Sequence, residues 1–133
     1  MAGFIGSPAM NFLAAKVGTN GRSVDLAGTG DRRVSMQLLS TVSAAPGAPV
    51  AVGLRPEHFV PTDHGALELE VDLAEPLGAD TLLHGRFGHA RELLTVRLPG
   101  HVLAKPGEKR RYGVSPERLH LFDSQTGKRL AGT

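Results

Sequence analysis

Glycine and proline interrupt this chain too often for long helices. The 133 residues include 17 glycines and 9 prolines, which are spread along the sequence rather than clustered. Both residue types end or bend regular elements, so the stretches between them are short. No apolar pattern with helical spacing extends over about ten or more residues. Short strands separated by turns favour an all-β barrel or sandwich over alternating strands and helices.

The clearest strand signal lies at residues 67–73, where four apolar residues alternate with three acidic ones. A period of two predicts a strand with one solvent-exposed face. Apolar runs bounded by turn formers predict eight more strands, at 12–17, 23–27, 34–39, 50–54, 81–87, 93–98, 109–115 and 119–122. The runs 81–87 and 93–98 are expected to form a hairpin with a loop of about five residues. Strands this short require a sheet that closes on itself or on another chain.

The charge and composition exclude several classes of partner. A formal net charge of +2 is too small to attract nucleic acid or anionic lipid strongly. No run reaches the roughly 18 apolar residues that span a bilayer. The apolar start of the chain lacks a basic region and is broken by Gly6, Ser7, Pro8 and Asn11, so it is not expected to be a signal peptide. We therefore expect no membrane insertion and no nucleic-acid partner.

The sequence offers no catalytic, cofactor-binding or metal-binding constellation. With no cysteine, it has neither disulfides nor thiolate ligands. Its six histidines, at 58, 64, 84, 89, 101 and 120, show no spacing typical of a zinc site. A phosphate loop and a nucleophile motif are also absent from the sequence.

The aromatic and basic residues predict ordinary structural roles. An oligonucleotide-binding barrel needs aromatic platforms for base stacking, and five phenylalanines with one tyrosine are too few. Phe12, Phe59, Phe87 and Phe122 lie in apolar surroundings and are expected to fill the core. The basic run 109–111 is expected to be a solvated strand end.

Four ordered motifs set this chain apart. Residues 3–13 read GFIGSPAMNFL, residues 53–58 read GLRPEH, residues 75–88 read EPLGADTLLHGRFG, and residues 119–123 read LHLFD, followed by Thr126 and Gly127. Taken alone, the first motif could be an ordinary buried turn. Together, the four resemble the C-terminal part of the ATP-binding subunits of maltose-type ABC importers for carbohydrates, polyols and glycerol-3-phosphate.

This resemblance implies an OB-like barrel, also called a TOBE or MOP-like domain, over residues 14–133. Residues 1–13 would be the junction with a nucleotide-binding domain that lies upstream. The junction and interface residues carried over from the motif are Gly3, Phe4, Ile5, Gly6, Ser7, Pro8, Met10, Asn11 and Phe12.

The family motif at Arg55, Pro56, Glu57 and His58 has two interpretations. In the first, Pro56 ends a strand, Arg55 pairs with a carboxylate or a carbonyl, and Glu57 caps a turn. In the second, the motif forms an ion pair with another domain or subunit, which would leave Arg55 partly exposed in this chain. The residue types alone favour the first interpretation.

The resemblance also implies a role without chemistry. The domain would regulate and dimerise the ATP-binding subunit at the cytoplasmic face of the inner membrane. ATP and Mg²⁺ would bind only in the missing domain. The partners would be a second copy, the nucleotide-binding domain and, through it, the permease subunits; some family members also bind regulatory proteins. The alternative is a MOP-like sensor of an oxyanion or small ligand, although no Ser/Arg/Asn constellation of the molybdate type is present.

Overall fold

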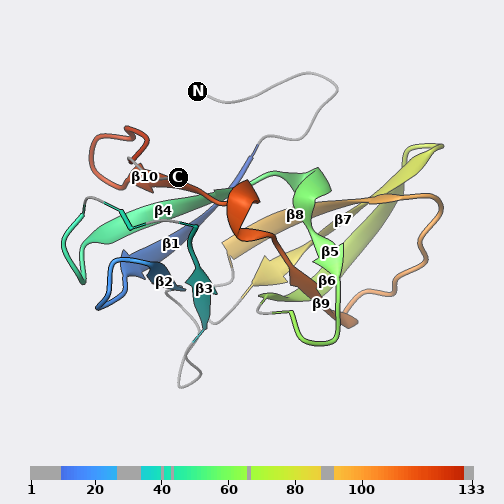
Figure 1. The fold of residues 1–133 in the computed structure, drawn as a ribbon. Coiled ribbons are helices and arrows are strands. Elements are labelled where there is room, and N and C mark those ends of the chain that lie inside the picture. The colour runs from blue at the N-terminus through green and yellow to red at the C-terminus, as the bar shows by residue number, and fades with distance from the viewer. Residues whose placement is uncertain are drawn as a thin grey trace.

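The computed structural model describes residues 10–26, 34–39, 41–42, 44–65, 67–87 and 92–130. Within these residues the chain forms two antiparallel sheets of five strands each, which lie side by side in Figure 1. Short 3-10 helices are the only helical elements in the described ranges. The predicted all-β, OB-like class is therefore confirmed.

The first sheet has the strand order β10-β4-β1-β2-β3. Its strands are β1 (Asn11–Val17), β2 (Ser23–Leu26), β3 (Ser35–Gln37), β4 (Pro49–Leu54) and β10 (His120–Asp123). The second sheet has the order β5-β9-β6-β7-β8. Its strands are β5 (Val60–Pro61), β6 (Leu67–Pro76), β7 (Asp80–Phe87), β8 (Glu92–Pro99) and β9 (Lys109–Gly113).

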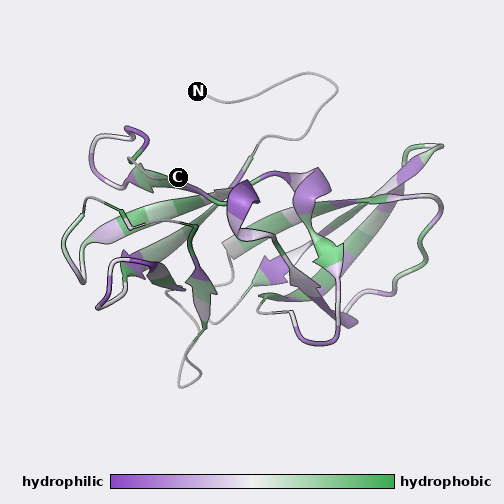
Figure 2. Cartoon of the chain, viewed as in Figure 1, coloured by the Kyte–Doolittle hydropathy of each residue, from purple (hydrophilic) through white to green (hydrophobic). Residues whose placement is uncertain are grey.

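Two similar crossover segments carry the chain from one sheet to the other. The 3-10 helix η1 (Pro56–His58) leads from β4 to β5, and η2 (Pro116–Arg118) leads from β9 back to β10. Both follow the pattern Gly-x-x-Pro-Glu, starting at Gly53 and at Gly113. Proline disfavours a helical conformation in the residue before it, so each strand ends and the chain turns there. Figure 2 shows both 3-10 helices as hydrophilic segments.

A single hydrophobic core joins the two sheets. Leu13, Val52 and Leu121 of the first sheet and Leu83 and Val96 of the second are all fully buried members of it. In β1 the buried residues alternate with exposed ones, as a half-buried strand requires. Each such side chain contributes about 1.5–3 kcal/mol when it leaves water. The core therefore stabilises both sheets together.

Two glycines allow backbone segments to approach closely. A Cβ atom on Gly65 would lie 2.3 Å from the carbonyl oxygen of Tyr112, where the turn before β6 crosses β9. A Cβ atom on Gly85 would lie 2.4 Å from the carbonyl oxygen of Glu70. Gly85 lies opposite Val71, where a shift in the β6–β7 register begins. Neither position has room for a larger residue.

All nine predicted strands are present, with ends that differ by a few residues. The predicted hairpin of residues 81–87 and 93–98 is β7 and β8, paired in register over their whole length. Three elements were missed: β5, η1 and η2. β5 has two residues and both 3-10 helices have three, too few to show a period in the sequence.

We predict that Gly65→Ala lowers the free energy of unfolding by about 2–4 kcal/mol, because its methyl group would displace the β9 backbone. Urea unfolding followed by circular dichroism measures this change. Gly113→Ala is the control, since its Cβ atom would meet only a side-chain methyl group of Thr62, at 3.3 Å. Equal stabilities for the two variants would contradict the close approach.

Candidate functional site

The junction motif enters the described structure at one end of the first sheet. Gly3, Phe4, Ile5, Gly6, Ser7 and Pro8 lie outside the described residues. Met10 immediately precedes β1, whereas Asn11 and Phe12 are its first two residues. Residues 11–13 are therefore part of the sheet, and the proposed domain boundary at residue 13 remains a prediction.

The side chain of Asn11 connects the two sheets. Its Nδ2 donates to the carbonyl oxygen of Thr95 at 2.8 Å, and its Oδ1 accepts from the Thr95 backbone N–H at 2.9 Å. Thr95 belongs to β8, which is an edge strand of the second sheet. The amide thus satisfies both backbone groups of Thr95, as a neighbouring strand would. Only 8% of Asn11 is exposed, so these bonds are largely shielded from water.

A polar chain continues from Thr95 across the outer face of the second sheet. The Thr95 hydroxyl lies 3.3 Å from Nδ1 of His84, and Nε2 of His84 lies 3.0 Å from a carboxylate oxygen of Glu75. His84 and Glu75 both belong to the third sequence motif, which forms the end of β6, a turn and β7. That motif therefore builds a hairpin whose outer face leads to Asn11.

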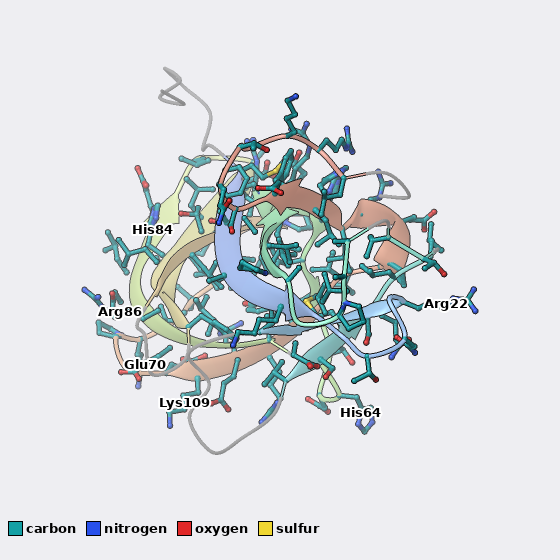
Figure 3. All side chains as sticks on the ribbon, turned by 90° about the vertical axis from the view of Figure 1, so that its left-hand side faces the viewer. Arg22, His64, Glu70, His84, Arg86 and Lys109 are labelled. Atoms are coloured by element: carbon teal, nitrogen blue, oxygen red, sulfur yellow. The ribbon has the colours of Figure 1, made fainter. Side chains whose placement is uncertain are left out.

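The rest of this outer face carries opposite charges on neighbouring strands. Lys109 of β9 lies opposite Glu70 of β6, which lies opposite Arg86 of β7. Figure 3 shows these side chains on one side of the molecule. Arg111, in turn, lies 3.5 Å from Glu68. The basic run 109–111 is thus a strand end with acidic neighbours, and such pairs contribute about 0.2–1 kcal/mol each.

Apolar side chains gather on the outer face of the first sheet. The rings of Phe12 and Phe122 meet edge to face with centroids 5.6 Å apart. Met10 and Phe122 also approach the face of Gly53, where a Cβ atom would lie 2.5 Å from the Met10 sulfur. Phe12 is nevertheless 48% exposed. The prediction that all four phenylalanines fill the core is wrong for Phe12 and Phe122, because their positions alternate with those of buried Leu13 and Leu121.

The Arg55–His58 motif forms η1 and its N-cap. Pro56 is buried and β4 ends two residues before it, as the first interpretation expected. That interpretation is wrong for Glu57, and its expected partner for Arg55 is not found among the described residues. Glu57 lies inside η1 rather than capping a turn, and η1 has no side-chain cap. Arg55 is exposed, and no hydrogen bond or ion pair joins its side chain to another described residue.

The fourth motif lies beside this one. His120 at the start of β10 faces Gly53 of β4 in register. Its Nδ1 accepts a hydrogen bond from Nη2 of Arg129, because a guanidinium can only donate. The pKa of His120 is lowered by burial and by the positive charges of Arg129, Arg55 and His58. Four basic groups therefore act within one small region.

The sequence interpretation missed this basic cluster. The histidine spacing argued only against a zinc site at His120, and no motif included Arg129. A turn brings Arg129 back beside β10, where it bridges to Phe122. The carboxylate of Asp123 holds that turn by accepting from the backbone N–H groups of Gln125 and Thr126, which lowers the Asp123 pKa. The spacing of Asp123 and Gly127 was the sequence signal that could have predicted this turn.

Neither a metal site nor a membrane-spanning helix occurs in the part of the chain that the structure describes. No group of three or more histidine and acidic side chains there could hold a metal ion. No helix among the same residues is long and apolar enough to cross a bilayer.

Comparison with known families identifies the domain. The MalK OB fold domain family matches residues 6–59, and the TOBE domain family matches residues 52–122, more than half of the chain. The chain belongs to the TOBE domain family. The two matches overlap at residues 52–59, which hold the end of β4 and η1.

Relatives of this TOBE domain include ATP-binding proteins of importers. It is 46% identical over 131 residues to the sn-glycerol-3-phosphate import ATP-binding protein UgpC of Ruegeria sp. (strain TM1040), covering 98% of this chain and 34% of the relative. It is 38% identical over 132 residues to the sulfoquinovosyl glycerol transport ATP-binding protein SmoE of Agrobacterium fabrum, covering 98% and 36%. The chain thus spans about a third of the length of these relatives. The resemblance found in the four motifs is confirmed.

A solved structure shows the same fold. It is the cytoplasmic molybdate-binding protein ModG with molybdate bound, with a TM-score of 0.66 and 14% sequence identity. The match covers 88% of this chain and 96% of the ModG chain. At this identity the likeness supports the OB-like fold alone.

We predict that Asn11→Leu lowers the free energy of unfolding by about 2–4 kcal/mol, because it leaves the N–H and C=O groups of Thr95 without partners. Thermal and urea unfolding measure the loss. Thr95→Val is the control, since it keeps both backbone bonds, removes only the hydroxyl, and should cost less than about 1 kcal/mol. A stable Asn11→Leu variant would show that the sheets do not need this amide.

The lowered pKa of His120 predicts a pH effect on stability. In the unfolded chain this histidine protonates near its ordinary pKa of 6.5, and in the folded chain only at lower pH. The contribution of His120 to the stability of the fold is complete above the unfolded pKa of 6.5. This contribution is lost as the pH falls from there through the lower pKa of the folded chain. His120→Gln should therefore reduce the fall in melting temperature between about pH 7 and pH 5. An unchanged pH profile would contradict the assignment.

Proposed function

We propose that this TOBE domain is the non-catalytic regulatory and dimerisation domain of the ATP-binding subunit of a sugar-type ABC importer. One observation carries the proposal: the match covers 98% of this chain but only about a third of each importer ATP-binding protein. The rest of such a subunit has room for a separate domain that binds ATP and Mg²⁺. Nucleotide chemistry would belong to that domain, since this sequence contains no phosphate loop.

The proposed mechanism is mechanical. Residues 3–13 would connect the domain to the nucleotide-binding domain. Asn11, near the end of this connection, holds the first sheet to the second through Thr95. A movement of the connection would therefore be passed to both sheets. The domain would then move with the nucleotide-binding domain as one rigid body.

The outer face of the first sheet supports a role in association. Met10 and Phe12 lie where the connection enters, and Phe12 remains half exposed. Exposed apolar side chains of this kind mark contacts with other proteins when they cluster. The partners would be the attached nucleotide-binding domain, a second copy of the subunit, the permease subunits and, in some importers, a regulatory protein. Such a complex would lie at the cytoplasmic face of the inner membrane.

A second candidate function is the sensing of an oxyanion or small ligand. The observation that favours it is the basic cluster around His120, which lacks carboxylate partners within the described ranges. The ModG likeness adds only the fold.

We predict that this chain can replace the matching third of the Ruegeria UgpC protein. The chimera should restore sn-glycerol-3-phosphate uptake to cells that lack UgpC, because the two domains share 46% of their residues. A UgpC protein truncated before this region, and a chimera carrying Asn11→Leu, are the matched controls and should both transport less. A chimera that is produced and binds its permease but fails to transport would contradict the proposal.

Sedimentation of the isolated chain tests dimerisation separately. A strict monomer at high micromolar concentration would count against the proposed dimer.

A further inference from the structure

The two crossovers bring basic residues from both ends of the chain to one place. Arg55 follows Gly53 by two residues, and His120 lies opposite Gly53 on the neighbouring strand β10. Because side chains alternate along strands, Gly53 and Arg55 share the outer face of the first sheet. Arg129 contacts His120 through its guanidinium. His58 is the last residue of η1, three residues after Arg55.

Acidic side chains near these groups in sequence, such as Glu57 and Glu117, form no ion pair with them among the described residues. The groups that act electrostatically on His120 are Arg129, Arg55 and His58, and all three are basic. Among the described side chains, none of the four is joined to a carboxylate by an ion pair. Two acidic side chains lie three residues from His120: Asp123, which is bound to the backbone of its own turn, and Glu117, which is exposed in η2.

A cluster of this kind is unfavourable without an anion. The guanidinium charges of Arg55 and Arg129 repel one another and disfavour the compact state, whereas His120 is neutral while its Nδ1 accepts from Arg129. The ring of His58 adds a second cost, because its Nδ1 is buried and has no hydrogen-bond partner among the described residues. Other arginines of this protein have carboxylate partners: Arg86 pairs with Asp72 at 3.0 Å, and Arg97 pairs with Asp80 at 2.7 Å. The two arginines of the basic cluster have no such partner among the described residues.

We propose that Arg55, His58, His120 and Arg129 form a binding site for a divalent oxyanion of the phosphate type. Guanidinium groups present several N–H donors in a plane that fits the oxygens of phosphate, and an exposed arginine can make these bonds without breaking others. His120 accepts from Arg129 at Nδ1, so its Nε2–H remains a donor. The site combines the second and fourth sequence motifs, and it does not depend on the proposed role in an importer.

The proposal is tested by isothermal titration calorimetry of the 133-residue chain with inorganic phosphate, at about 0.15 M chloride to screen long-range attraction. Parallel titrations with sulfate and with glycerol 3-phosphate separate a general oxyanion site from one that selects phosphate monoesters. We expect saturable binding of one anion per chain. Arg55→Gln and Arg129→Gln should each raise the dissociation constant about tenfold or more, because each removes a charge-assisted hydrogen bond. Nuclear magnetic resonance should show the ring signals of His58 and His120 moving on titration.

Arg22→Gln is the matched control. It removes the same charge from an exposed arginine in the turn between β1 and β2, which Figure 3 shows extending away from the molecule. Five residues of β1 separate this turn from Phe12, at the end of the sheet that carries the basic cluster. The turn therefore lies roughly 15 Å or more from Phe12. The dissociation constant should not change. Weakening equal to that of Arg55→Gln would overturn the proposal by showing non-specific attraction, and so would the absence of saturable binding of all three anions. Circular dichroism confirms that each variant is folded.

Discussion

The pairing of the Asn11 amide with the Thr95 backbone holds the structure's two sheets in their mutual arrangement. Apolar burial draws the sheets together but has no direction of its own, so it leaves their relative position loosely defined. Two hydrogen bonds from one nearly buried amide set that position at a single point. The same bonds pair the backbone of the edge strand β8 at Thr95, where its N–H and C=O groups would otherwise be left without these partners.

The exchange of strands explains why distant motifs meet. η1 carries the chain from the first sheet to the second, and η2 carries it back, so β10 pairs with β4 although 65 residues separate His120 from Arg55 in sequence. The shared Gly-x-x-Pro-Glu pattern gives both crossovers the same geometry. Aromatic and basic side chains consequently gather at the end of the first sheet where the chain enters. Such a surface suits contact with a partner or an anion better than contact with water alone.

Much of the fold could be predicted from local signals. The alternation at residues 67–73 and the apolar runs between turn formers located nine strands, because a half-buried strand repeats every two residues. The motifs located the family. The roles of single residues were harder to predict: Phe12 was expected in the core, and Arg55 was expected to have a partner. Both depend on which face of a strand points inward and on what lies across it, and neither fact is encoded in a window of neighbouring residues.

By itself the sequence determined that this chain folds into short strands, contains no phosphate loop and resembles an importer subunit, because composition, spacing and motifs are properties of the chain alone. Only the tertiary structure decided that Asn11 reaches the backbone of β8, that Arg129 contacts His120, and that His120 lies opposite Gly53, two residues before Arg55. The physical reason is that strand pairing sets these contacts, and pairing depends on register and on the two crossovers rather than on separation along the chain.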